Sequence, residues 1–188
     1  MFDAIADFYI KSHPITLAVL ALLALYFIGL NWTFFYRYFS LNQWLEKETN
    51  SLESLLMGAV KVTENSFLHH FIKTSNKLSR EILDLGNYAA TKEATKGLSF
   101  LSIVASTAPF IGLFGTVVSI LDTFDNIGRA SGTMTIIAAG VSDALVATAA
   151  GIFVAIFAYT YHQILKRKSY ELSGLIRMQS DALLSRWG

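Results

Sequence analysis

The sequence predicts an all-α, polytopic membrane protein with three transmembrane helices and cytoplasmic helical extensions. Hydrophobic residues make up 53% of the 188 residues and charged residues only 15%, which is too apolar for an ordinary soluble domain of this length. Three apolar runs are long enough for the roughly 20 helical residues that cross the hydrocarbon of a bilayer. They lie between Lys11 and Arg37, between Lys96 and Asp122, and between Arg129 and Lys166.

The apolar runs and the basic residues together divide the chain into seven segments. Basic residues near the ends of spans are retained on the cytoplasmic side, and all except Lys11 and Arg129 fall between the first two runs or after the third. The predicted segments are a short periplasmic amino terminus (1–13), a first span (14–36), a cytoplasmic helical domain (37–96), a second span (97–121), a short periplasmic loop (122–131), a long third span that extends into the cytoplasm (132–165) and a cytoplasmic carboxyl-terminal tail (166–188).

The first run is expected to remain as a membrane anchor and not to be removed as a signal peptide. Its apolar core is too long, and it ends in an aromatic belt where a cleavage site needs small residues. The belt consists of Trp32, Phe34, Phe35, Tyr36 and Tyr38.

The cytoplasmic segment is predicted to form amphipathic helices, because residues 40–96 contain no proline and carry apolar residues at helical spacing. Only Gly86 and Gly97 interrupt the second half of this pattern, so we expect its last helix to continue into the second span. The third span, from Gly132 to Leu165, would be roughly 50 Å long as one helix and should project into the cytoplasm.

Asp143 is the one charged residue between Arg129 and Lys166. It lies about 16 Å along the predicted third span, near the middle of the membrane, where a carboxylate facing lipid costs roughly 2.5 to 3.5 kcal/mol. Such an acid usually faces a partner, a cavity or an ion path, so ion translocation is the first hypothesis. The alternative is a buried, protonated acid that only fixes helix packing through a hydrogen bond.

The second span carries a seam of small, hydroxylated or proline residues at alternating steps of three and four. Its members are Ser102, Ala105, Pro109, Gly112, Thr116, Ser119 and Thr123. Such a seam allows close helix packing and can hold water or cross-helix hydrogen bonds, so structure and function both remain open. Counted back from Asp122, Gly112 is expected at nearly the depth of Asp143, which would place the acid against this seam.

Thr148 is a candidate second hydroxyl of an ion path. It follows Asp143 by five residues, which offsets it by about 140° on a helical wheel. It could extend a relay if a second helix or a water molecule bridged that offset. A hydroxyl bonded to its own preceding turn is the alternative.

Two stretches carry the most specific motifs of the sequence, STAPFIGLFGTVVSILDTF at 106–124 and GVSDALVATAAGIFVAI at 140–156. They resemble the proton-channel family of ExbB and TolQ, with MotA as a more distant relative. The family's APFIGLFGTV and acid-Ala-Leu-x-Ala-Thr-x-x-Gly patterns match at Pro109, Gly112, Gly115, Thr116, Asp143, Ala144, Leu145, Ala147, Thr148 and Gly151.

The resemblance implies a bacterial inner-membrane protein that forms a ring of five copies around two single-span partners similar to ExbD or TolR. Proton flow through the ring would then energise work at the cell envelope, with a TonB- or TolA-like protein as a further partner. By the same resemblance Asp143 is the acid of the ring, and Thr116 and Thr148 are the two hydroxyls of the pore. The expected pore-lining or packing residues are Ser102, Ala105, Pro109, Gly112, Gly115, Ser119, Ala147 and Gly151.

The chain departs from the family pattern at two positions. Asp143 stands where glutamate is typical, so its carboxyl reaches about one methylene less far. Phe157 stands where a proline usually follows Ala-Ile, so the third span lacks a helix interruption that could serve as a hinge.

Other function classes find no support in the sequence. The chain has no cysteine, no G-x-S-x-G elbow, no phosphate loop and no histidine and carboxylate set at metal-ligand spacing. Its net charge of +1 provides no basic patch for nucleic acid. We therefore expect no enzyme, cofactor or metal, and keep two alternatives to the proton channel: a non-conducting membrane scaffold and a MotA-like stator.

Overall fold

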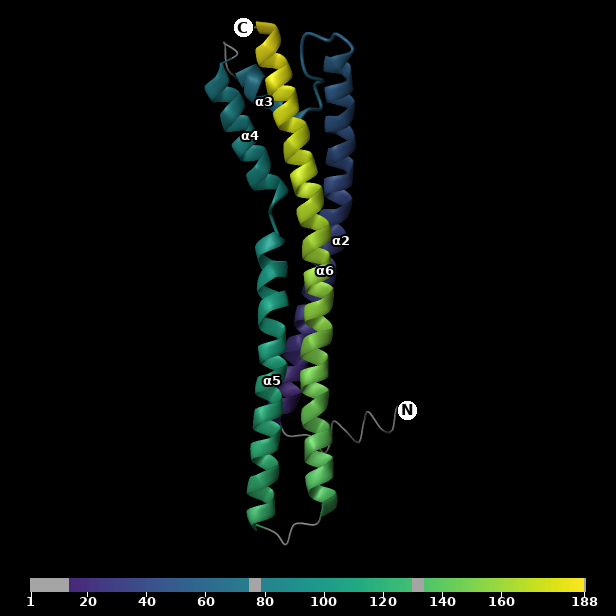
Figure 1. Ribbon diagram of the computed structural model, residues 1–188, viewed down its shortest axis with the longest axis vertical. Helices are drawn as coiled ribbons and strands as arrows, with labels where there is room; N and C mark the ends of the chain where they lie inside the picture. Colours follow the sequence, from purple (N-terminus) through teal and green to yellow (C-terminus); the bar gives the residue numbers. More distant parts are fainter. Residues whose placement is uncertain (1–13, 75–78, 130–133, 188) are drawn as a thin grey trace. The chain divides into compact units, whose positions relative to one another are not determined.

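The computed structural model of the protein describes residues 14–74, 79–129 and 134–187. Within these residues lie the helices α2 (Pro14–Leu56), α3 (Phe67–Thr74), α4 (Arg80–Ala94), α5 (Leu98–Arg129) and α6 (Met134–Trp187), which are labelled in Figure 1. The described residues contain no strand. Three helical stretches, in α2, α5 and α6, are long and apolar enough to cross a membrane. The predicted all-α class with three membrane-spanning helices is confirmed.

The chain folds as two compact units. Unit 1 contains Met1–Trp32 and Phe100–Tyr161, and unit 2 contains Thr33–Ser99 and His162–Gly188. The first part of α2, nearly all of α5 and the first part of α6 form unit 1. Unit 2 contains the remainder of α2 and α6 together with α3 and α4, and we describe each unit by itself.

The long helices extend past the predicted spans. α5 continues through the expected periplasmic loop as far as Arg129, and α6 continues through the expected tail to Trp187. Neither extension contains a proline, which would end or bend the helix. Each contains one glycine, Gly128 in α5 and Gly174 in α6, and the helix continues through it. Helix α6 also passes Phe157 without interruption, and this ring packs edge-on against Phe27, with centroids 5.5 Å apart.

The expectation that the last cytoplasmic helix continues into the second span is wrong. Helix α4 ends at Ala94, and a turn over 95–97 separates it from α5. The break occurs at Gly97, whose φ of +85° is a conformation that other residues rarely adopt. Arg37 stabilises the end of α4, because its Nη2 donates to the carbonyl oxygens of Glu93 (2.7 Å) and Ala94 (3.0 Å).

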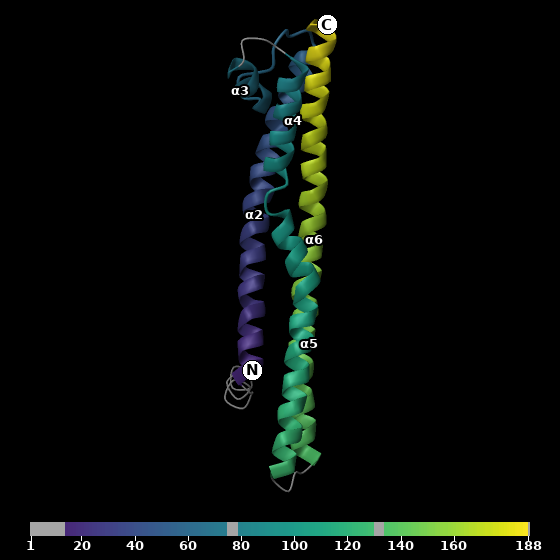
Figure 2. The ribbon, with the colours of Figure 1, turned by 90° about the vertical axis from the view of Figure 1, so that its left-hand side faces the viewer.

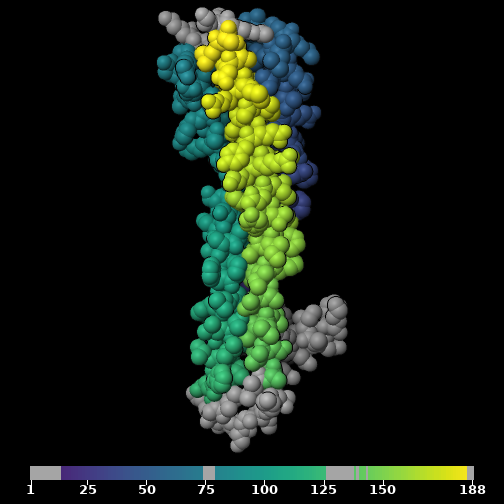
Figure 3. Space-filling model, viewed as in Figure 1, coloured from purple at the N-terminus to yellow at the C-terminus, as the bar shows by residue number. Residues whose placement is uncertain are grey.

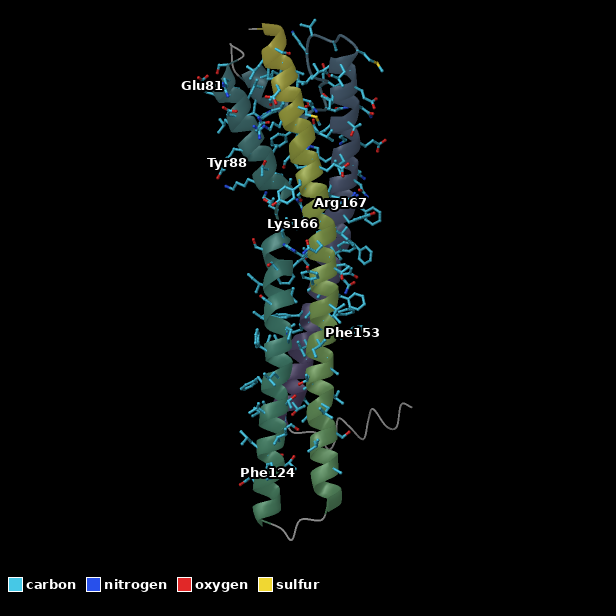
Figure 4. All side chains as sticks on the ribbon, viewed as in Figure 1. Glu81, Tyr88, Phe124, Phe153, Lys166 and Arg167 are labelled. Carbon is cyan, nitrogen blue, oxygen red and sulfur yellow. The ribbon has the colours of Figure 1, made fainter. Side chains whose placement is uncertain are left out.

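Helix α4 begins after Ser79, which lies in an extended conformation as the residue preceding the first turn. Glu81, labelled in Figure 4, occupies that turn, where a negative charge is favourable beside the positive end of the helix dipole. A hydrogen bond from the side chain of Ser79 lowers the pKa of the Glu81 carboxyl. The start of α4 is therefore specified by local polar contacts.

A buried carboxylate joins α2, α6 and the segment before α3 within unit 2. Glu48 is 0% exposed, and its two oxygens accept four hydrogen bonds. The donors are Trp44 Nε1 (3.0 Å), the Phe67 backbone N–H (2.7 Å), Ser66 Oγ (2.9 Å) and Gln179 Nε2 (2.8 Å). Because burial of a carboxylate is costly unless its acceptors are satisfied, these bonds fix all three segments together.

Replacing Glu48 with glutamine tests this cluster at constant side-chain volume. We expect Glu48→Gln to lower the local opening free energy around α3 by about 2 kcal/mol or more, because an amide nitrogen cannot accept two of the four bonds. Hydrogen exchange of the amides in Phe67–Thr74 measures the effect. The exposed Glu46 provides the matched control, and equal exchange in Glu48→Gln and Glu46→Gln would contradict the proposed clamp.

Candidate functional site

Helices α2 and α5 run antiparallel in unit 1. A Cβ atom built at Gly29 would lie 3.5 Å from the ring of Phe100 near the start of α5. Towards the opposite end of α5, a Cβ at Gly115 would lie 3.0 Å from Val19 Cγ1. Figures 1 and 2 show α2, α5 and α6 side by side in this unit.

Helices α2 and α6 run parallel. Phe27 lies against Phe153 and Phe157, with ring centroids 5.7 and 5.5 Å apart. One turn further along both helices, the hydroxyl of Tyr161 donates to Asn31 Oδ1 (3.1 Å). Figure 4 labels Phe153 on α6. These contacts fix which residues of the three helices lie at the same level.

The backbones of α5 and α6 lie close together at Gly112 and Gly151. A Cβ at Gly112 would lie 2.6 Å from the carbonyl oxygen of Ala147 and 3.1 Å from Gly151 Cα. A Cβ at Gly151 would lie 2.6 Å from the carbonyl oxygen of Ala108 and 3.0 Å from Gly112 Cα. No side chain fits at either position, so the two backbones lie directly against each other there. The space-filling view in Figure 3 shows α5 and α6 next to each other.

This close contact brings two hydroxyls together between the helices. Thr116 Oγ1 forms a short hydrogen bond with Thr148 Oγ1 and lies 2.9 Å from the carbonyl oxygen of Ala144 and 3.3 Å from that of Gly112. A hydroxyl has one proton to donate, so Thr148 can donate to Thr116 while Thr116 donates to Ala144. The hydroxyl of Thr148 thus contacts a hydroxyl of α5. A contact with a second helix was one of the alternatives left open by the five-residue spacing from Asp143, the other being a bond within its own helix.

The polar contacts continue towards the carboxyl end of α5. Ser119 Oγ lies 3.5 Å from the carbonyl oxygen of Gly140, and Thr123 Oγ1 donates to the carbonyl oxygen of Ser119 (2.8 Å). Ser119 and Thr123 are each 7% exposed. A Cβ at Gly140 would meet the side chain of Thr123, 2.8 Å from its Cγ2. Glycine at 140 therefore lets this hydroxylated face lie against α6.

The predicted seam of α5 lies against α6 over only part of its length. Of its members, Gly112, Ser119 and Thr123 are buried and Thr116 is half-buried, whereas Ser102 is exposed and Ala105 and Pro109 are half-buried. The buried residues at the start of α5 are instead Leu101, Val104 and Ala108. A strict alternation of three and four residues drifts around a straight helix. The buried face is instead identified by a longer average spacing between its residues, which are at positions 101, 104, 108, 112, 115, 119 and 123.

The expectation that Gly112 lies at the depth of Asp143 is wrong. Gly112 lies against Ala147, Thr148 and Gly151, and it is Thr116 and Ser119 that reach the carbonyls of Ala144 and Gly140, on either side of position 143. The error is about seven residues, or about 10 Å along a helix. Its cause is that α5 continues seven residues beyond Asp122 to Arg129, so depth counted from Asp122 is too small.

Asp143 lies within α6, and its side chain is outside the part of the chain that the structure describes. Its backbone position is one residue before Ala144, whose carbonyl Thr116 contacts. Among the described residues, no group of histidines and carboxylates could hold a metal ion. The candidate site therefore comprises an acid of α6 and the hydroxyls that α5 and α6 present next to it.

These features define a multi-pass helical membrane protein with a glycine-packed, hydroxyl-bearing contact between two of its spans. The profile of the MotA/TolQ/ExbB proton channel family matches residues 59–178. An ExbB-like biopolymer transport protein of Helicobacter pylori is 43% identical over 188 residues, which cover 99% of this chain and 100% of that protein. The chain therefore belongs to the MotA/TolQ/ExbB proton channel family, which confirms the predicted resemblance and places it among transport proteins.

Two further relatives match a shorter part of the chain. Biopolymer transport protein ExbB of Neisseria gonorrhoeae is 51% identical over 73 residues, covering 38% of this chain and 33% of that protein. Biopolymer transport protein ExbB of Pseudomonas putida is 36% identical over 95 residues, covering 50% of this chain and 28% of that protein. The similarity to these two proteins is thus confined to half of the chain or less.

Adding a methyl group at Gly112 tests the backbone contact. We expect Gly112→Ala to destabilise the detergent-solubilised protein by about 1 to 3 kcal/mol, because an added atom 2.6 Å from a carbonyl oxygen forces the helices apart. Thermal unfolding monitored by circular dichroism measures the effect. Gly174 is the matched control, since a Cβ there has nothing within 4 Å, and alanine is the better helix former. Equal melting of both variants would contradict the close contact.

Proposed function

We propose that this protein is an ion-conducting subunit of the bacterial inner membrane, which assembles as an oligomeric ring around an ExbD- or TolR-like single-span partner. The ring would couple the proton motive force to work at the cell envelope, through a TonB- or TolA-like protein. Membership of the MotA/TolQ/ExbB proton channel family supports this role. The ring of five copies rests on the family resemblance.

The observation that carries the proposal is the hydroxyl pair between α5 and α6 beside position 143. Thr116 and Thr148 come from different helices and share a hydrogen bond, and Thr116 also lies 2.9 Å from the carbonyl oxygen of Ala144. Asp143 is the neighbour of Ala144 in α6. An acid and two linked hydroxyls within about a turn and a half of helix supply the groups that a proton relay needs.

The physical mechanism depends on the cost of charge inside the membrane. A carboxyl group away from water favours its neutral form and releases its proton when a charged or hydrated partner approaches. Thr116 and Thr148 can each accept and donate a hydrogen bond, so they can stabilise either state of that acid. A potential of 100 mV provides about 2.3 kcal/mol per elementary charge, so useful work requires repeated passages.

The orientation belongs to the same proposal. The distribution of basic residues supports an amino terminus in the periplasm and a carboxyl terminus in the cytoplasm. In that orientation Asp122 and Asp125 mark the periplasmic end of α5, and the polar contacts of unit 2 lie on the cytoplasmic side. Protons entering from the periplasm would meet position 143 before the Thr116 and Thr148 pair.

A non-conducting scaffold is the second candidate, and the glycine contact favours it. Gly112 and Gly151 allow close helix packing with no need for an ion. In a scaffold, changes at these glycines would abolish assembly, whereas the charge at position 143 would be dispensable. The two functions therefore differ in what they require of Asp143.

Proton flux into liposomes that contain the protein and its single-span partner tests the role of the acid. We expect Asp143→Asn to reduce flux at least tenfold, because an amide cannot take up and release a proton at neutral pH. A pH-sensitive dye inside the liposomes reports the flux under an imposed potential. Asp84→Asn, at an exposed acid of α4, serves as the control.

Two outcomes would contradict the channel. Undiminished flux in Asp143→Asn would remove the acid from the path. Intact cellular activity in Asp143→Asn, combined with loss of assembly in Gly112→Leu, would establish the scaffold.

The hydroxyl pair makes a separate prediction. We expect Thr116→Val and Thr148→Val each to lower flux about two- to tenfold, the equivalent of one lost hydrogen bond of about 0.5 to 1.5 kcal/mol. The double variant should lose less than the product of the two, because both changes remove the same contact. Thr107→Val is the control, since its hydroxyl donates within its own helix to Ile103 (2.8 Å). If the flux reductions of the two single variants multiply in the double variant, the hydroxyls act independently, which would contradict the prediction.

A further inference from the structure

Thr16 of α2 is buried and has an unsatisfied hydroxyl. The side chain is 1% exposed, and its Oγ1 makes no hydrogen bond with any residue that the structure describes. Other threonines of unit 1 donate to a carbonyl of their own helix, as Thr107, Thr123 and Thr160 do. Buried hydroxyls in proteins are almost always paired with protein or with ordered water, so this one requires an explanation.

The position of Thr16 in the first turn of α2 explains why it lacks the usual partner. A helical threonine commonly bonds to the carbonyl three or four residues earlier. Helix α2 begins at Pro14, so those carbonyls belong to residues before the helix. A partner from elsewhere is needed, and the candidates are a polar group of another span or a water molecule.

The packing of Val19 fixes which residues surround this part of α2. A Cβ at Gly115 would lie 3.0 Å from Val19 Cγ1 and 2.9 Å from Ala147 Cβ. Val19 therefore lies where α5 and α6 meet, and it is 6% exposed. Because α2 is parallel to α6 and antiparallel to α5, one turn back along α2 from Val19 corresponds to one turn back along α6 from Ala147 and one turn forward along α5 from Gly115.

Thr16 lies one turn before Val19 on the same buried stripe, about 4.5 Å along the helix axis. On α5, one turn after Gly115 lies Ser119. On α6, one turn before Ala147 lies the turn that contains Asp143. Ser119 is itself buried, and its hydroxyl lies 3.5 Å from the carbonyl oxygen of Gly140. An unsatisfied hydroxyl of the first span thus lies at the level of the acid and of a second buried hydroxyl.

We propose that Thr16 is a third hydroxyl of the ion path and binds the water molecule through which Asp143 exchanges its proton. This inference rests on the proposed channel function. A buried water needs two to four polar partners, and the groups that would provide them at this level of unit 1 are Thr16, Ser119 and the carbonyl of Gly140. All three spans then contribute a polar group to the path, with Thr16 as a positioning residue for the acid.

Dye-reported proton flux in the liposomes of the channel test, with the single-span partner present, also tests this role. We expect Thr16→Val to lower flux about tenfold, which corresponds to about 1.4 kcal/mol in the barrier. Thr16→Ser keeps the hydroxyl and should retain flux within about twofold of the wild type. Thr107→Val, the same change at a hydroxyl bonded within its own helix, should leave flux unchanged.

Stability separates a path role from a packing role. Valine replaces a hydroxyl that has no described protein partner with a methyl group of similar size, so Thr16→Val should melt close to the wild-type temperature. Loss of flux at unchanged stability, restored by serine, supports the proposal. If Thr16→Val does not assemble, the comparison of Thr16→Ala with Thr16→Ser provides the same contrast between absence and presence of the hydroxyl.

The outcomes distinguish this inference from the channel itself. Wild-type flux in Thr16→Val, together with loss of flux in Asp143→Asn, overturns the role of Thr16 and leaves the channel intact. Absence of flux in the wild type, or full flux in Asp143→Asn, overturns the channel and the role of Thr16 with it. A flux loss in Thr16→Ser as large as that in Thr16→Val also overturns the proposal, because the hydroxyl would then be irrelevant.

Discussion

The approach of α5 and α6 at Gly112 and Gly151 is the constraint on which the candidate site depends. Each glycine brings its Cα to about van der Waals distance from the backbone of the other helix, where a Cβ would lie 2.6 Å from a carbonyl oxygen. Only at that separation can the side chain of Thr116 reach both Thr148 and the carbonyl of Ala144. Hydrogen bonds weaken steeply with distance, so the glycines determine the polar chemistry one turn away.

The two units solve the burial of polar groups differently. In unit 1 the described polar contacts between helices pair hydroxyls with hydroxyls, with backbone carbonyls or with the amide oxygen of Asn31, all of them uncharged groups, which limits the cost of desolvation. In unit 2 a fully buried carboxylate, Glu48, accepts four hydrogen bonds from three segments of the chain. A charge satisfied in this way specifies one arrangement of the segments that it joins. The unsatisfied hydroxyl of Thr16 contrasts with both cases.

The sequence was sufficient for the number of spans and for the glycines and hydroxyls of the α5 seam near residues 112–123, because local hydrophobicity and spacing determine both. It was insufficient for register, since Asp122 and Asp125 marked the end of the span but did not end the helix. Gly86 and Gly97 were equivalent in the sequence, yet Gly86 packs within α4 against Leu68 and only Gly97 adopts a positive φ. The Glu48 cluster joins residues that are 131 positions apart, which no local pattern can reveal.

The uninterrupted passage of α6 through Phe157 restricts how the proposed ion passage could be coupled to movement. A proline at this position would remove a backbone hydrogen bond and favour a bend, whereas Phe157 continues the helix and packs against Phe27 and Phe153. Any displacement near the acid must then be accommodated by sliding or rotation of whole helices. At Gly112 and Gly151 the two backbones meet without a side chain between them, so such a movement would have to release only the neighbouring contacts of Thr116 with Thr148 and with the carbonyl of Ala144.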